Sequence, residues 1–157
     1  VYYSAFSPIP DASAVLPLKR PPLLREHRLY QADWLTRFYG FEVGEILDDG
    51  AGGMLDLTVD PKLAWALRHR ARFPVDVNRA DRETLLRVPG LGTKSVGKIL
   101  ETRRFRRLRL EDVGKIARSI TTLRHFIVAE GWRPGASLDS ERLKQHLAPK
   151  PQQLALL

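Results

Sequence analysis

The sequence predicts a mainly α-helical protein built around a helix-hairpin-helix, and three observations support that fold class. An apolar-Pro-Gly-apolar-Gly pentad at residues 88–92 lies between two segments with helical hydrophobic spacing. A strongly basic stretch follows it directly. A second pair of helix-like segments comes after that stretch, which suggests a tandem arrangement in which the second hairpin is degenerate.

The pentad has a chemistry of its own. Gly90 and Gly92 allow positive φ and carry no Cβ, so consecutive amide N–H groups can face outward. These donors come at the start of a helix, where the dipole also favours an anion, and Lys94 adds a full positive charge. In a basic protein the expected anion is a nucleic-acid phosphate. The alternative is a tight turn between packed helices that serves only as scaffold.

The flanking segments complete the motif. Asn78 is predicted to cap the helix before the hairpin, with Asp81 three residues later. The helix after the hairpin is predicted to run through Arg103. Gly97 inside it costs about 1 kcal/mol relative to alanine, which is tolerable if it lets the two helices approach closely.

Charge is concentrated beside the hairpin. The chain of 157 residues has a net charge of +8, and residues 94–124 hold ten Lys or Arg against three acidic residues. Such a run is often only a solvated face. Next to a phosphate-binding hairpin it is expected to attract DNA, and without sequence preference, since phosphates carry no sequence information.

Several classes of protein and site are excluded. Since the chain has no cysteine, these residues hold no disulfide, thiolate metal site or iron–sulfur ligand. Its four histidines show no ligand spacing, so no metal site and no cofactor is expected in this chain. There is no transmembrane-length apolar run and no signal-peptide pattern, and the expected localisation is cytoplasmic.

The second helix pair is predicted at residues 110–116 and 120–130. Ala117, Arg118 and Ser119 join its members without a glycine. We therefore expect this second hairpin to pack against the first and to contribute Arg118 at most.

The N-terminal part differs in composition. Five of the eleven prolines fall in residues 1–25, which predicts an extended segment, with a β-prone stretch at 1–6. An amphipathic helix is predicted at 26–39 and ends at Gly40. Residues 41–60 carry six acidic groups and no basic ones, which favours a loop or short strands.

Asp60 and Pro61 predict the start of another helix, because aspartate caps and proline fits the first helical position. That helix is expected to run to Pro74, and a short helix is expected within 138–147. Four aromatic residues of the predicted helices are assigned to the core rather than to stacking on a base: Tyr30, Trp34, Phe38 and Trp65.

Five segments carry a resemblance to a known family. They are residues 2–10 (YYSAFSPIP), 25–35 (REHRLYQADWL), 38–41 (FYGF), 60–65 (DPKLAW) and 73–81 (FPVDVNRAD). Together with the hairpin, they resemble the C-terminal part of the DNA modification/repair radical S-adenosylmethionine (radical SAM) proteins. The resemblance covers about residues 1–133.

This resemblance implies a larger enzyme with a radical SAM barrel upstream, of which residues 1–6 would be the last strand. It also implies a 4Fe-4S cluster, S-adenosylmethionine and a uracil-DNA-glycosylase-like partner. The family's Cys-x-x-x-Cys-x-x-Cys motif is absent here, so no cluster ligand can be carried over. The chain begins at Val1, in the middle of a motif, as a fragment would, and we expect it not to be catalytic by itself.

Two rival interpretations remain open. In helix-hairpin-helix base-excision glycosylases, a Lys after the hairpin is the nucleophile and an Asp follows about eighteen residues later, as Lys94 and Asp112 do. A nucleophilic Lys needs a depressed pKa, and the sequence around Asp112 does not match those enzymes. Asp112 could equally cap or begin the third helix. The other rival is a scaffold that docks the glycosylase-like partner.

The expected function is non-specific binding of the DNA backbone. The expected division is an extended segment plus helix at 1–60, a DNA-binding helix-hairpin-helix domain at 61–133 and a polar tail at 134–157. The base or lesion, the preference for duplex or single strand and the oligomeric state are not predicted. The expected DNA-binding residues are Gly90, Leu91, Gly92, Thr93, Lys94, Ser95, Lys98, Arg103, Arg104 and Arg106.

Overall fold

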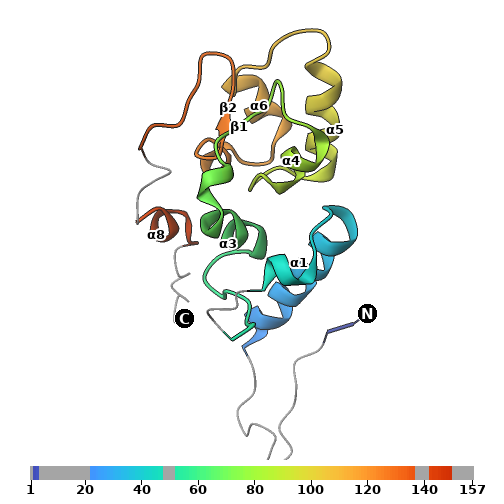
Figure 1. Cartoon of the computed structure of the whole chain (residues 1–157), viewed down its shortest axis with the longest axis vertical. Helices are drawn as coiled ribbons and strands as arrows, with labels where there is room; N and C mark the ends of the chain where they lie inside the picture. Colours follow the sequence, from blue (N-terminus) through green and yellow to red (C-terminus); the bar gives the residue numbers. More distant parts are fainter. Residues whose placement is uncertain (1, 4–21, 48–51, 137–141, 150–157) are drawn as a thin grey trace, which may run out of the picture.

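The computed structural model describes residues 2–3, 22–47, 52–136 and 142–149 (Figure 1). This part of the chain is mostly helical, with one small two-stranded sheet. None of its helices is both long enough and apolar enough to cross a membrane. The predicted strand at 1–6 and the predicted extended segment at 1–25 lie outside the described residues, apart from residues 2–3 and 22–25. Residues 23–25 begin a helix, so the extended segment was predicted to end too late.

Among the described residues before Arg70, the chain forms three α-helices. Helix α1 (Leu23–Phe38) begins three residues before the predicted start. Helix α3 (Pro61–Arg68) starts as predicted, because the Asp60 side chain accepts a hydrogen bond from the Leu63 amide at 3.0 Å. It ends earlier than predicted, and a separate 3-10 turn, η2 (Arg70–Arg72), follows.

Helix α2 (Val43–Ile46) corrects the prediction of a loop or strands for one part of the acidic segment at 41–60, whose other described residues form no helix. Its single turn is stabilised by a capping box, in which the Glu45 carboxylate accepts from the Glu42 amide at 2.9 Å. The Glu45 carboxylate also accepts from Arg87 at 2.8 Å, which ties α2 to the next part of the chain. The ion pair with Arg87 could not be predicted from the acidic composition of the segment, because the two residues are far apart in the sequence.

The helix before the hairpin, α4 (Arg82–Arg87), is capped by Asp81, whose carboxylate accepts from the Thr84 amide at 2.7 Å. The prediction that Asn78 caps it was wrong. The Asn78 side chain accepts from the Leu108 amide at 2.8 Å and donates to the Leu108 carbonyl at 3.1 Å. The Asn78 side chain therefore binds a residue thirty positions away in the sequence and does not cap the nearby helix.

The helix predicted at 120–130 was also wrong beyond its first turn. Helix α7 (Ile120–Leu123) is short, and the chain then enters strand β2 (Ile127–Val128). This strand pairs in parallel with β1 (Val75–Asp76), in the register Val75 to Ile127. The β-branched pair at 127–128 gains ladder hydrogen bonds that a continued helix would not provide.

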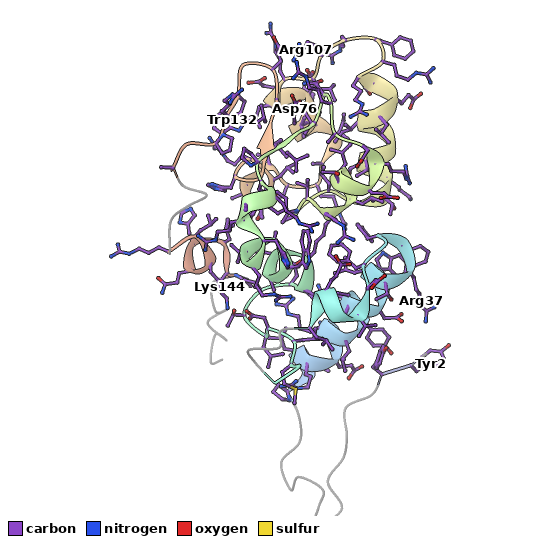
Figure 2. All side chains as sticks on the ribbon, viewed as in Figure 1. Tyr2, Arg37, Asp76, Arg107, Trp132 and Lys144 are labelled. Atoms are coloured by element: carbon purple, nitrogen blue, oxygen red, sulfur yellow. The ribbon has the colours of Figure 1, made fainter. Side chains whose placement is uncertain are left out.

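A short helix near the C-terminus, α8 (Leu143–Leu147), lies within the predicted range. Lys144 of α8, labelled in Figure 2, forms an ion pair with Asp56. Burial raises the pKa of Asp56, but the hydrogen bonds from Lys144 and Thr58 outweigh it and lower this pKa to about 2. The ion pair thus holds α8 beside the loop that precedes α3.

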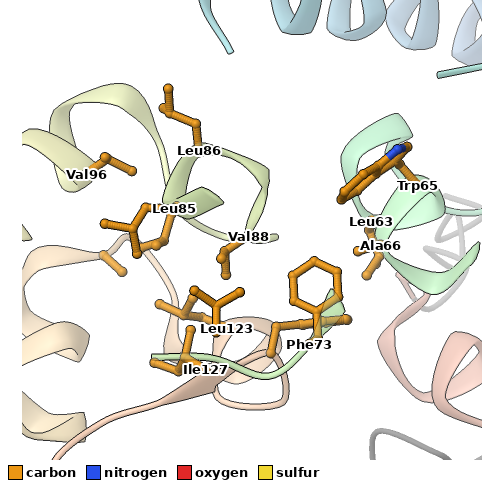
Figure 3. Close-up of a cluster of buried hydrophobic side chains, with 14 of the residues drawn as sticks. Leu63, Trp65, Ala66, Phe73, Leu85, Leu86, Val88, Val96, Leu123 and Ile127 are labelled. Carbon is orange, nitrogen blue, oxygen red and sulfur yellow. The ribbon is translucent and has the colours of Figure 1, made fainter. Parts of the chain in front are cut away.

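The two halves share one buried cluster, which continues through helices α5 (Thr93–Thr102) and α6 (Leu110–Ile116). Four aromatic rings run through it in sequence: Phe41 to Trp65 at 5.3 Å, Trp65 to Phe73 at 6.2 Å and Phe73 to Phe126 at 5.2 Å. Figure 3 shows Phe73 between α3 and the apolar side chains around Leu123. The N-terminal helices are therefore packed on the same core that supports the hairpin.

Candidate functional site at the first hairpin

The first hairpin is anchored by its apolar residues. Val88 and Leu91 are fully buried, and the Leu91 amide donates to the Val88 carbonyl at 3.2 Å. Gly90 has φ of +88°, a value that L side chains rarely adopt. Gly92 is the N-cap of α5 with φ of −94° and ψ of 167°, so the expected positive φ is found only at Gly90.

The start of α5 offers free donors. The first amides of any helix have no intrahelical acceptor, and here they follow Gly92. Lys94 and Lys98, both exposed, are four residues apart and share one face of α5. This combination of open amides, the positive end of a helix dipole and two cations can bind an anion.

The second hairpin lies directly against the first. A Cβ built on Gly90 would sit 3.2 Å from the Leu123 Cβ in α7. The Ser95 hydroxyl of α5 donates to the Ile116 carbonyl of α6 at 3.2 Å. Exposed Arg118, between α6 and α7, lines the same pocket as the first hairpin. Two adjacent helix pairs are thus present, although the last helix is the single turn α7 and not the longer helix predicted at 120–130.

Gly97 does not have the role that the sequence suggested. A Cβ built there would meet nothing within 4 Å, so α5 makes no close helix approach at this point. The close approach occurs instead at Gly90, in the hairpin itself. Glycine at 97 therefore has no packing reason in the described part of the chain.

Lys62 was missed by the sequence analysis. Its Nζ donates to the Leu91 carbonyl at 2.6 Å and lies 4.6 Å from the centroid of the Tyr39 ring. The residue is only 7% exposed. Burial lowers the pKa of Lys62 to about 7, although the Asp60 carboxylate acts in the opposite direction. The available signal was a lysine inside an otherwise apolar run at 61–66.

A cavity of about 560 Å³ lies between α1 and the first hairpin. Residues 90–92 and Lys62 form one side of it, and aromatic residues of α1 and its end form another. The prediction that Tyr30, Trp34 and Phe38 belong to the core was wrong, because all three are exposed, Trp34 by 56%. Trp65 is buried, as predicted.

The exposure of these aromatics follows from how α1 packs. Leu35 and Arg28 are its buried residues, and the helix packs on α3 and α2. An adjoining side of α1 carries Trp34 and Phe38, whose ring centroids are 4.3 Å apart and whose side chains are both exposed. The periodicity of α1 in the sequence did not show which of its apolar residues would pack against the rest of the protein.

Some arginines of the basic stretch at the end of α5 and after it form hydrogen bonds with other protein groups. Arg103 donates to the carbonyls of Val77 at 3.1 Å and Ala80 at 2.6 Å, which is a packing role not foreseen from the sequence. Arg106 donates both terminal nitrogens to the Asp112 carboxylate, each at 2.8 Å. Among the arginines named as contacts, Arg104 is exposed and has no such protein partner in the described chain.

Lys94 and Asp112 are placed differently from a nucleophile and its helper. Lys94 is exposed at the start of α5. The hydrogen bonds from Arg106 and from the Arg109 amide lower the pKa of Asp112 to about 2. Asp112 thus caps the first turn of α6, the alternative role that its sequence position allowed. In the described residues, no group of three or more His, Cys, Asp or Glu could hold a metal ion.

Comparisons with known proteins give one informative match. The chain is 36% identical over 105 residues to the Holliday junction branch migration complex subunit RuvA of Micrococcus luteus. The match covers 60% of this chain and 45% of that protein, so the chain spans less than half the length of the relative. No protein-family model matches the chain, and no solved structure matches it.

Proposed function

We propose that this chain binds the DNA backbone without sequence preference through the first hairpin and the first turn of α5. The observation that carries the proposal is the geometry of this turn: open helix amides follow Gly92, and Lys94 and Lys98 project from the same helix. The similarity to a subunit of a Holliday junction complex supports DNA as the polyanion, because such a junction is made of DNA.

The proposed contacts divide into two groups. Backbone amides of Gly90, Gly92 and Thr93, with the side chains of Thr93, Lys94, Lys98 and Arg104, would contact phosphate. The Leu91 amide and the Ser95 hydroxyl already donate to the carbonyls of Val88 and Ile116, so these two residues would shape the turn and not bind phosphate themselves. Arg103 and Arg106 would act through their charge, since their guanidinium groups already have protein partners. Binding would be non-specific because phosphate contacts position a protein on DNA and read no base.

The resemblance to the radical SAM family suggests the larger enzyme in which this DNA binding would take place. In that setting residues 61–133 would hold DNA for chemistry carried out by an upstream barrel, with residues 1–60 joining the two. A uracil-DNA-glycosylase-like protein would then be a partner of the longer enzyme. The dense set of motifs at residues 2–81 supports this context.

The test is fluorescence anisotropy with labelled duplex and single-stranded DNA across a salt series. If the hairpin and its neighbours contact about 3–5 phosphates, log Kd plotted against log salt should have a slope of about 3 to 4.5 in magnitude. Lys94→Glu should weaken binding. Arg133→Glu makes the same charge change beside Trp132, which lies on the other side of Figure 2 from α5, and should weaken it much less.

Two results would overturn the proposal. One is no binding at low salt. The other is equal loss in Lys94→Glu and Arg133→Glu, which would mean that net charge alone attracts DNA and that the hairpin is scaffold.

A further inference from the structure

The cavity beside the first hairpin combines two kinds of surface. On the α1 side it is aromatic and partly open to solvent, with Tyr30, Trp34 and Tyr39 among its lining residues. On the hairpin side the cavity is lined by the backbone of residues 90–92 and by two basic side chains. These are Lys62 of α3 and Arg118 of the second hairpin. Its volume of about 560 Å³ falls in the range of small-ligand sites.

We propose that this cavity takes one unpaired nucleotide of the bound DNA, with its base against Trp34 and Tyr39 and its phosphate toward Lys62 and Arg118. The inference rests on the proposed DNA binding and adds a preference that the hairpin alone does not provide. It assigns a task to the exposed Trp34 ring of α1, whereas the neighbouring Tyr30 ring packs edge-on against Tyr3 with ring centroids 5.2 Å apart.

The aromatic side favours a base. Nucleobases stack on exposed aromatic rings whatever their sequence, because every base has a π-face. In a continuous duplex both faces of a base are covered by its neighbours, whereas an unpaired base can leave the stack. Trp34 presents its ring at the rim of the cavity, next to the hairpin that would hold the adjoining phosphates.

Glycine at positions 90 and 92 leaves the hairpin backbone uncovered where it lines the cavity. A Cβ built on Gly92 would lie 3.6 Å from the Tyr39 hydroxyl, an ordinary van der Waals distance, so Gly92 and the hydroxyl end of Tyr39 are neighbours in the cavity wall. A larger side chain at position 92 would project into this space. The backbone at 90–92 can thus come close to a nucleotide that also touches Tyr39.

The charges favour an anionic ligand over an apolar peptide. The cavity is lined by two cations, Lys62 and Arg118, and by one carboxylate, Asp60, which accepts from the Leu63 amide as the cap of α3. In the described chain no carboxylate lies within ion-pair distance of Lys62. A phosphate beside its Nζ would supply the missing counter-charge. Burial has lowered the pKa of this amine to about 7, and an anion would raise it again.

The experiment compares a fully paired duplex with the same duplex carrying one bulged 2-aminopurine. Kd is measured by anisotropy, and stacking is measured as quenching of 2-aminopurine fluorescence. The wild-type chain should bind the bulged duplex at least about 5-fold more tightly and quench its fluorescence. Trp34→Ala should abolish both the preference and the quenching, and Trp34→Phe should keep part of each. Because Trp34 is exposed, neither change threatens the fold.

The control is Phe105→Ala, which removes another exposed aromatic side chain, one outside the cavity lining. It should leave the ratio of the two Kd values unchanged. The inference is overturned if wild type binds both duplexes equally, or if Trp34→Ala keeps the ratio and the quenching. In those cases the aromatic face would be a surface for a protein partner. If the wild-type chain binds neither duplex, or if Lys94→Glu leaves the Kd for DNA unchanged, the proposed function itself would be rejected.

Discussion

The Lys62 Nζ donates a hydrogen bond to the main-chain carbonyl of Leu91 at 2.6 Å, across twenty-nine residues of sequence. This bond joins α3 to the turn of the first hairpin. It also places a buried amine against the backbone of the hairpin that is proposed to bind DNA. The stability of the protein and the properties of that site are therefore linked through one side chain.

Replacing this lysine should change how stability depends on pH. The folded pKa of Lys62 is about 7, below the ~10.4 of an unfolded lysine, so its burial is a destabilising contribution. This contribution is fully present below pH ~7 and disappears as pH rises to ~10.4. Wild type should thus gain on the order of a few kcal/mol relative to Lys62→Met across that window.

The measurement is chemical denaturation of both proteins between pH 6 and 10. Lys94→Met is the control, because it removes an exposed lysine on the same hairpin. Its stability should run parallel to wild type at every pH. Parallel curves for Lys62→Met would show that the Lys62 amine is not desolvated in solution.

Gly90 and Gly97 should respond in opposite ways to alanine. Gly90→Ala should destabilise the protein by about 1–3 kcal/mol, since its φ of +88° is unfavourable for an L residue and the new Cβ would lie 3.2 Å from Leu123. Gly97→Ala should stabilise it by about 0.5–1 kcal/mol, because it is helical and faces open space. Thermal unfolding measures both, and equal effects would contradict the hairpin geometry.

Arg103 and Arg104 are neighbours with different expected roles. Arg103→Gln should cost about 1–3 kcal/mol of stability, because the carbonyls of Val77 and Ala80 lose their donor. Arg104→Gln should leave stability unchanged. It should weaken DNA binding and reduce the salt slope by about 1. Denaturation and the anisotropy series separate the two roles, and a stability loss confined to Arg104→Gln would reverse the assignment.

Local interactions were the predictable part of the fold. Asp60 as a cap, the helices on both sides of the pentad and the second helix pair all depend on residues within a few positions of one another. The errors have the opposite character. Asn78 binds Leu108, and residues 127–128 pair with β1, so in both cases a distant partner replaced the local one.

The candidate site divides in the same way. The hairpin with Lys94 and Lys98 could be found from the sequence, because the motif is contiguous and its chemistry follows from glycine, helix amides and charge. The cavity could not, since Trp34, Lys62 and Arg118 line it together from α1, α3 and the turn between α6 and α7. Sequence spacing also gave no sign that Arg103 and Arg106 already have protein partners.

The sequence by itself therefore determined the helical class, the hairpin and the positive charge beside it, because these depend on local backbone preferences and on composition. Three features depend on tertiary packing: Lys62 supports the hairpin, Trp34 and Phe38 of α1 stay exposed, and the two hairpins share one cavity. The physical reason is that burial and hydrogen-bond partners are set by packing between elements distant in the chain, which local periodicity does not encode.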